Sequence, residues 1–437
     1  MVADCATIKV FGEVPPAPGR QPFDLGNAIF IKDGMCAHNP RLNYLRGVGL
    51  SIDPFITPVA ELELGLAQDI PTFYSFYSPP DLTTLSGQPV RIRDLRQPRH
   101  AFIYGEPGSG KTTLRFALEA ECRAVLAEDL VVTYSLGEDV QAPLSIEAHG
   151  DRLARAMAID LFIQIVERFD PRIYPNPEQV AALKRQIAIG GVHLYRLIRT
   201  IIDSPRPEAR AGLGTYWAFL GRSPVRYISS SQPLLDLLND CLHDLPAVAP
   251  SLQGWESVWQ AIETARLWGF ERALVLIDGV DTRDRDVQAM FGLIQPLLAQ
   301  IEVAQDHNLS FKFFLPRELQ SRVTAFVQTI STHLKFSPLE AKIEWNGEAL
   351  QQMLIQRFRS AGSYYTGFAA LTDKDFSPRV DSLLIEKAAG SPRRMLHLAS
   401  ALIDAHIVHS PSETRIREAD WAAMLETMKH FNHGNAG

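Results

Sequence analysis

Cysteine is scarce in this sequence, and no two cysteines are close enough to form a Cys-x-x-Cys pair. Cys5, Cys36, Cys122 and Cys241 are scattered along 437 residues. Neither a zinc site nor a redox pair of that kind is indicated, and scattered thiols are typical of a reducing compartment. Residues 1–10 lack the basic start and the long apolar stretch of a signal peptide, so we expect a cytoplasmic protein.

Long apolar runs and an excess of positive charge are also missing. No apolar run approaches the roughly 18 residues of a membrane-spanning helix, so we expect no membrane segment. The 43 basic and 50 acidic residues give a net charge of −7, which argues against a general nucleic-acid-binding surface. With 46% hydrophobic and 21% charged residues, the composition is that of a globular chain with room for two or three domains.

The strongest motif in the chain is a glycine-rich segment that matches the pattern G-x-x-x-x-G-K-[ST]. It reads Gly105-Glu106-Pro107-Gly108-Ser109-Gly110-Lys111-Thr112. The apolar run 101–104 predicts a buried strand before it, and 113–120 predicts a helix after it. In this context backbone N–H groups wrap around phosphate oxygens, and the helix N-terminus adds a positive dipole end. We therefore predict that residues 105–112, together with Thr113, bind ATP or ADP.

Within this loop, Lys111 and Thr112 carry the chemistry. Lys111 is expected to reach the β- and γ-phosphates, and the Thr112 hydroxyl is expected to bind Mg²⁺. Asp278 directly follows the apolar run 273–277 and is the expected magnesium partner opposite Thr112. Asp281, three residues further on, is a candidate general base for the attacking water, with a solvated loop acid as the alternative.

Two arginines are candidates for contacts with the phosphates. Arg317 follows the strand predicted at 311–315 and is a candidate sensor of the γ-phosphate; a surface arginine is the alternative. Arg393 lies in Gly390-Ser391-Pro392-Arg393-Arg394, where Ser391 and Pro392 predict a helix start. Cations are unfavourable at a helix N-terminus, which favours a role for Arg393 in binding an anion such as a nucleotide phosphate; a surface salt bridge is the alternative.

Alternating strand and helix patterns predict an α/β fold with a doubly wound, mainly parallel sheet. Continuous or β-rich apolar runs predict strands at 101–104, 130–135, 273–277 and 311–315, with a short edge strand at 341–345. Residues 81–86 are a possible helix. Residues 177–270 read almost wholly helical, with helices at 178–203, 209–220, 231–245 and 254–268, which predicts a helical insertion.

Three parts of the chain follow from these patterns. Prolines and glycines in residues 1–70 predict an extended N-terminal arm. Residues 71–345 form the predicted nucleotide-binding core with its insertion at about 177–270. Residues 346–437 read as helices, and predict a C-terminal helical lid.

Taken together, these motifs resemble those of the AAA+ and STAND classes of P-loop ATPases. The sequence Asp278-Gly279-Val280-Asp281 is similar to the Walker B motif of NACHT-type STAND proteins, and Arg393 resembles the sensor 2 arginine of AAA+ lids. The segment around Trp345 and the lead-in Asp53-Pro54-Phe55 resemble a group of bacterial ATPases. The resemblance covers roughly residues 53–430, and implies a P-loop fold with Mg-ATP bound between core and lid.

The leading hypothesis is a regulatory ATPase in which Mg-ATP binding or hydrolysis moves the lid and changes self-assembly or the binding of a protein partner. A DNA-associated ATPase of the initiator or transposition-helper kind is one alternative, although the net charge of −7 does not favour it. A small-molecule kinase is another. Thr282 stands where NACHT-like motifs usually carry Glu, so a slowly hydrolysing, nucleotide-locked scaffold is also open.

Overall fold

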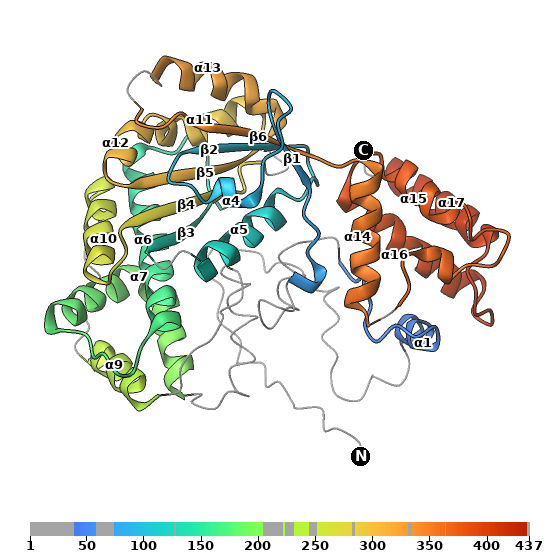
Figure 1. Ribbon diagram of the computed structural model, residues 1–437, viewed down its shortest axis with the longest axis horizontal. Helices are drawn as coiled ribbons and strands as arrows, with labels where there is room; N and C mark the ends of the chain where they lie inside the picture. Colours follow the sequence, from blue (N-terminus) through green and yellow to red (C-terminus); the bar gives the residue numbers. More distant parts are fainter. Residues whose placement is uncertain are drawn as a thin grey trace.

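The computed structural model of the chain describes residues 39–57, 74–125, 128–137, 139–203, 222, 231–243, 251–281, 285–330, 334–362 and 364–434. These residues form a sheet flanked by helices (the sheet unit) and, beside it, a smaller group of C-terminal helices (the helical unit) (Figure 1). The predicted α/β class with a mostly parallel sheet is confirmed.

Six strands form one sheet in the spatial order β1-β6-β2-β5-β4-β3. Neighbouring strands are parallel, except for the antiparallel pair β1 and β6. The strands are Asp81–Thr84 (β1), Ala101–Gly105 (β2), Asp129–Ser135 (β3), Arg272–Asp278 (β4), Leu309–Pro316 (β5) and Leu339–Glu344 (β6). The carboxyl ends of β2, β5 and β4 therefore meet at one edge of the sheet, with β5 in the middle.

Two predicted elements differ from the structure. The possible helix at 81–86 is the strand β1, because the β-branched Thr83 and Thr84 favour extended backbone and pair with β6. The strand predicted at the sheet edge near 341–345 lies inside the sheet, because β1 covers its outer side.

Helices cover both faces of the sheet. On one face lie the short α4 (Ile92–Leu95) and α5 (Lys111–Val125), whose Leu114 and Leu118 pack against β2 and β4. On the other face lies a larger layer, made up of α6 (Ile146–Arg168), α10 (Trp255–Leu267), α11 (Val287–Leu298), α12 (Ile301–Asp306) and α13 (Gln320–Ile330). Successive residues of each strand point to opposite faces, so the same strands supply both cores.

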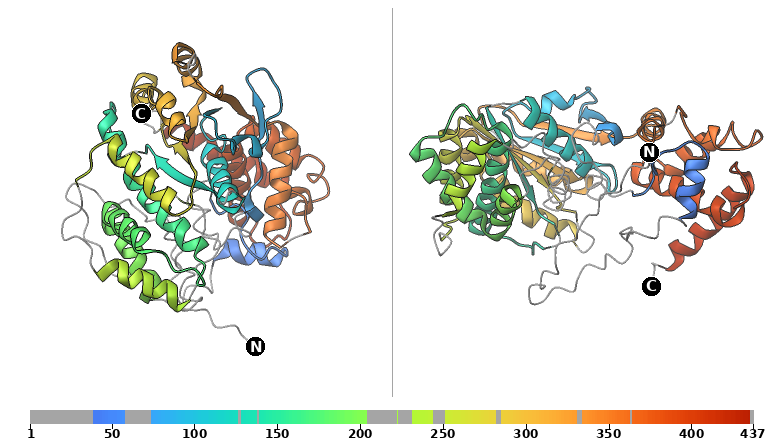
Figure 2. Two further views of the ribbon diagram at one scale, coloured as in Figure 1. Left: turned by 60° about the vertical axis from the view of Figure 1, so that its left-hand side comes forward. Right: turned by 90° about the horizontal axis from the view of Figure 1, so that it is seen from below.

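The predicted insertion is only partly separate from this layer. The helices α7 (Pro177–Asp203) and α9 (Gln232–His243) pack outside α6, away from the sheet (Figure 2), whereas α10 packs directly along α6. The helix predicted at 209–220 lies outside the described residues.

The C-terminal helices have a hydrophobic core of their own. They are α14 (Gly347–Ser360), α15 (Val380–Ala388), α16 (Pro392–His409) and α17 (Glu418–Gly434). The helix α1 (Pro40–Gly47) packs on α16, and Leu45 and Phe55 join this core. Over residues 39–57 the chain thus differs from the predicted extended arm, because its apolar side chains pack against the C-terminal helices. The rest of residues 1–70 lies outside the described residues.

One described stretch, Val287–Asp306, is long and apolar enough to cross a membrane by length and composition. In the structure it consists of α11 and α12, whose Leu293, Leu297 and Ile301 are fully buried in the core of the sheet unit. A single stretch of this kind is weak evidence for a membrane protein, and core helices pass the same test.

Side chains of α6 cover the backbone of β3, which is at the edge of the sheet. The Gln164 side chain accepts from Val131 N at 3.1 Å and donates to Val131 O at 2.7 Å, and Asp160 Oδ2 accepts from Thr133 N at 2.9 Å. Because residues four apart share a helix face, α6 satisfies groups that an additional strand would otherwise bind.

Replacing Gln164 with Leu should lower the free energy of unfolding by about 2–4 kcal/mol, because two buried backbone groups of Val131 lose their partner. Chemical denaturation measures the change. Gln260→Leu, at an exposed position of α10, is the matched control and should change stability little. Equal effects of the two substitutions would contradict this account of the sheet edge.

Lys312 is a fully buried lysine in the middle of β5. Its Nζ donates to Gln97 O at 2.6 Å and to Arg99 O. Burial lowers the pKa of the Lys312 ammonium from 10.5 to about 7. Carbonyl oxygens solvate the charge only partly, so the neutral amine is favoured more in the folded chain than in the unfolded one.

Unfolding should therefore take up a proton between about pH 7 and 10.5, and the free energy of unfolding should rise with pH across this window. The slope is up to about 1.4 kcal/mol per pH unit. Denaturation at a series of pH values checks it. Lys312→Met should flatten the rise, while Lys335→Met, at an exposed site, should not; the same slope in all three proteins would contradict the assignment.

Candidate functional site

The glycine-rich segment lies where β2 ends and α5 begins. Gly108 and Gly110 have φ angles of +76° and +86°, in the left-handed region that favours glycine. A side chain at Gly105 would place its Cβ 2.3 Å from Ser109 Oγ. The loop is closed by a hydrogen bond of 3.1 Å from Ser109 N to Glu106 O. The sequence thus forms a tight turn that leads directly into the first turn of α5.

Lys111 is buried under this loop and has three oxygen partners. Its Nζ donates to Gly105 O at 3.1 Å and to Glu106 O at 3.2 Å, and forms an ion pair of 2.8 Å with Asp281 Oδ2. The exposed fraction of the Asp281 side chain is 24%, so solvent reaches this carboxylate. Lys111 and Asp281, which are both predicted catalytic residues, are therefore in contact.

Asp278 ends β4 and faces α5. Its Oδ1 accepts from Gly279 N at 2.8 Å, and its Oδ2 lies 3.4 Å from Arg115 Nε. Thr112 is three residues before Arg115, and residues at this spacing are neighbours on a helix surface. The structure therefore places Asp278 beside the helix turn that carries Thr112.

Arg115 belongs to a row of buried charges along α5. Its guanidinium pairs with Glu119 at 3.2 Å, Glu119 pairs with Arg123 at 3.0 Å, and Arg123 pairs with Glu167 of α6. This alternation gives each buried charge an opposite neighbour. It fixes Arg115, and through it the carboxylate of Asp278.

The two predicted arginines lie near the loop in different ways. Arg317, directly after β5, is exposed and lies 3.4 Å from Glu106 Oε1 of the loop. Arg393, in the first turn of α16, donates its backbone N–H to Gly108 O at 3.4 Å. A Cβ at Gly108 would lie 3.1 Å from Arg393 Cβ, so the start of α16 rests directly on the loop.

Arg285 is a residue of the site that sequence reasoning did not assign. Its guanidinium donates to five carbonyl oxygens at 2.5–3.2 Å, from Leu136, Gly137 and Val140 after β3 and from Gly279 and Val280 after β4. It joins these two loops and so sets the backbone between Asp278 and Asp281. Its position in a run of alternating charges gave no sign of this role.

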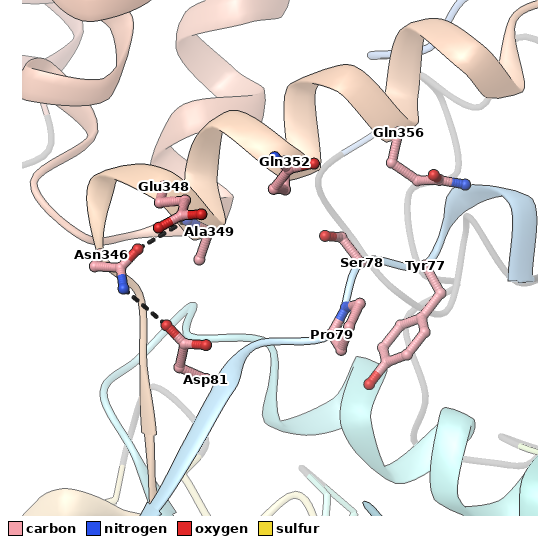
Figure 3. Close-up of a pocket in the computed structure, with 9 residues that line it drawn as sticks. All are labelled: Tyr77, Ser78, Pro79, Asp81, Asn346, Glu348, Ala349, Gln352 and Gln356. Atoms are coloured by element: carbon pink, nitrogen blue, oxygen red, sulfur yellow. Dashed lines mark hydrogen bonds between the residues drawn. The ribbon is translucent and has the colours of Figure 1, made fainter. Parts of the chain in front are cut away.

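A cavity of about 540 Å³ lies between α14 and the segment before β1 (Figure 3). Tyr77, Ser78 and Pro79 line one side, and Gln352 and Gln356 of α14 line the other. Asn346 closes one end, where its amide donates to Asp81 at 2.8 Å. Most of the side chains that line the cavity are polar, and the Tyr77 ring points from its segment toward α5.

The described residues contain no group of three or more His, Cys, Asp or Glu that could hold a metal ion alone. The predicted magnesium pair, Thr112 and Asp278, offers one hydroxyl and one carboxylate. Mg²⁺ is commonly bound by one or two protein oxygens and completed by phosphates and water, so this pair fits a nucleotide-bound ion.

Comparisons with protein-family models, with curated proteins and with solved structures found no match.

Arg285→Lys should lower the free energy of unfolding by about 1.5–3 kcal/mol, because an ammonium cannot reach five carbonyls of two loops. Hydrogen exchange should also become faster in residues 136–140 and 279–281. Arg322→Lys, at an exposed position that contacts Gln288, is the control. If exchange in both loops were unchanged in Arg285→Lys, its role as a link between them would be wrong.

Proposed function

We propose that this chain is a regulatory ATPase that binds Mg-ATP at the loop between β2 and α5. The observation that carries the proposal is the convergence on this loop of Lys111, Asp281 and the start of α16. A buried cation, a carboxylate from the neighbouring loop and a second structural unit meet at one helix N-terminus. A helix N-terminus with a lysine and nearby carboxylates supports the binding of a triphosphate and its metal ion.

The loop fits phosphate oxygens by its backbone. The first N–H groups of α5 have no acceptor within the helix and carry the positive end of its dipole. Ser109 Oγ is buried and has no hydrogen-bond partner among the described residues. Both features favour an anion with several acceptor oxygens, such as the triphosphate of Mg-ATP. Bound Mg-ATP would also supply the phosphate bond that is hydrolysed.

The nucleoside part is assigned to the cavity beside Tyr77. Asn346, which lines the cavity, follows Trp345, whose indole Nε1 donates to Ser109 O at 2.8 Å. The cavity therefore adjoins the segment that touches the loop. The Gln352 amide offers a donor and an acceptor for the polar edge of a base, whereas Gln356 Nε2 already donates to Ser75 O at 2.7 Å.

The Lys111–Asp281 pair explains how binding would change the site. For Lys111 to bind a phosphate oxygen of the triphosphate, its ion pair with Asp281 must break. Breaking this pair leaves Asp281 beside the site, where a carboxylate can orient a water or accept its proton. The helical unit, which contacts the loop through α16, would change its position with the loop and so alter a surface for self-assembly or for a protein partner.

A slowly hydrolysing, nucleotide-held scaffold is the second candidate. The specific observation that favours it is the same ion pair of 2.8 Å, because this pair must break before the Asp281 carboxylate can act on water. Single-turnover hydrolysis by wild type and by Asp281→Asn distinguishes the candidates, since equal rates would remove Asp281 from catalysis.

Lys111→Ala should weaken Mg-ATP binding by about 100-fold, because a charged hydrogen bond to phosphate contributes up to about 3 kcal/mol. Isothermal titration calorimetry measures the affinity. Lys335→Ala, which removes an exposed lysine paired with Asp306, is the control and should bind as wild type does. Unchanged affinity in Lys111→Ala would contradict the proposed site.

A further inference from the structure

Trp345 lies where the sheet unit, the C-terminal helices and the phosphate loop meet. It follows β6 and precedes α14, and its ring packs against the hydrophobic core under α5 and also against that of the helical unit. Its Nε1 donates to Ser109 O in the loop at 2.8 Å. A Cβ at Gly390, in the turn before α16, would lie 3.3 Å from Trp345 O.

The indole hydrogen bond fixes one peptide plane of the loop. In a trans peptide the C=O and the following N–H point in opposite directions. Because Ser109 O points to Trp345, the N–H of Gly110 points away from it. No heavy atom lies within 4 Å of an ideal Cβ at Gly110, so there is open space beside this residue.

The neighbouring carbonyl is also held by the helical unit. Gly108 O accepts from Arg393 N, in the first turn of α16. The other loop carbonyls that Lys111 contacts, Gly105 O and Glu106 O, are held by the sheet unit itself. The loop is therefore fixed on one side by its own lysine and on the other by two donors linked to the C-terminal helices.

We infer that Trp345 is a positioning residue that couples the conformation of the phosphate loop to the placement of the helical unit. It turns the Ser109–Gly110 peptide so that an N–H is available to an anion, and it carries any shift of this peptide to α14 and to the turn before α16. The inference extends the proposed function, on which its role in nucleotide binding rests. The coupling itself is a property of the protein alone.

The test compares Trp345→Phe, which keeps an aromatic ring and removes the N–H donor, with wild type. Hydrogen exchange is measured first without nucleotide. Arg393 N lies in the first turn of α16 and its acceptor is Gly108 O, so its exchange reports the contact between the units. We expect exchange at Arg393 and in residues 105–112 to be about five-fold faster, the equivalent of about 1 kcal/mol for one hydrogen bond.

Trp268→Phe is the matched control, because Trp268 Nε1 is buried and has no hydrogen-bond partner among the described residues. This substitution should leave hydrogen exchange unchanged at Arg393 and in residues 105–112. Incorporation of benzothienylalanine at position 345 replaces the N–H by sulfur in a ring of nearly the same shape as indole. It should reproduce the faster exchange of Trp345→Phe, and it keeps the test valid if the smaller phenyl ring of that variant perturbs folding. Unchanged exchange in residues 105–112 and at Arg393 would overturn the inference.

Affinity for Mg-ATP is measured afterwards and should fall about five-fold in Trp345→Phe but not in Trp268→Phe. If wild type bound no Mg-ATP while the exchange results held, the proposed function would fail and the coupling would stand. If wild type bound Mg-ATP and Trp345→Phe bound it equally well with unchanged exchange, the coupling would fail and the proposed function would stand.

Discussion

A buried ammonium group needs oxygen partners, and the partners of Lys111 hold the site together. Two of them are loop carbonyls after β2, and the third is Asp281 after β4. Because β5 separates β2 from β4, only the parallel arrangement of all three strands brings these groups to one sheet edge. The pair links the two loops across the intervening strand. An anion that replaced Asp281 would loosen one loop from the other.

The second constraint is that the loop lies between two structural units. Arg285 ties the loop after β4 to the loop after β3, and the charge row that begins at Arg115 holds Asp278 against α5. These contacts make the sheet side of the site rigid. The helical side is held by hydrogen bonds to Gly108 O and Ser109 O, which are fewer and lie at the junction of the units. A conformational change is therefore most easily accommodated on the helical side.

The strands β2 to β6 and the main helices could be predicted from periodicity, because their apolar residues follow one face or one run. Lys111, Asp278 and Asp281 could be placed at one edge because parallel strands align their carboxyl ends. The strand β1 was not predicted, since four residues stabilised by β6 carry little signal of their own. Arg285 and Trp345 were not assigned to the site, because their partners are backbone carbonyls distant in sequence, and no residue pattern marks such acceptors.

The most direct measurement is hydrogen exchange across the whole wild-type chain with and without Mg-ATP. If the loop binds a triphosphate, exchange should slow in residues 105–114, where we propose that the phosphates bind. Exchange should change at 278–281, where Asp281 loses Lys111, and at 391–394, where α16 meets the loop. Unchanged exchange in residues 105–114 at saturating Mg-ATP would contradict the central claim that this loop binds the nucleotide.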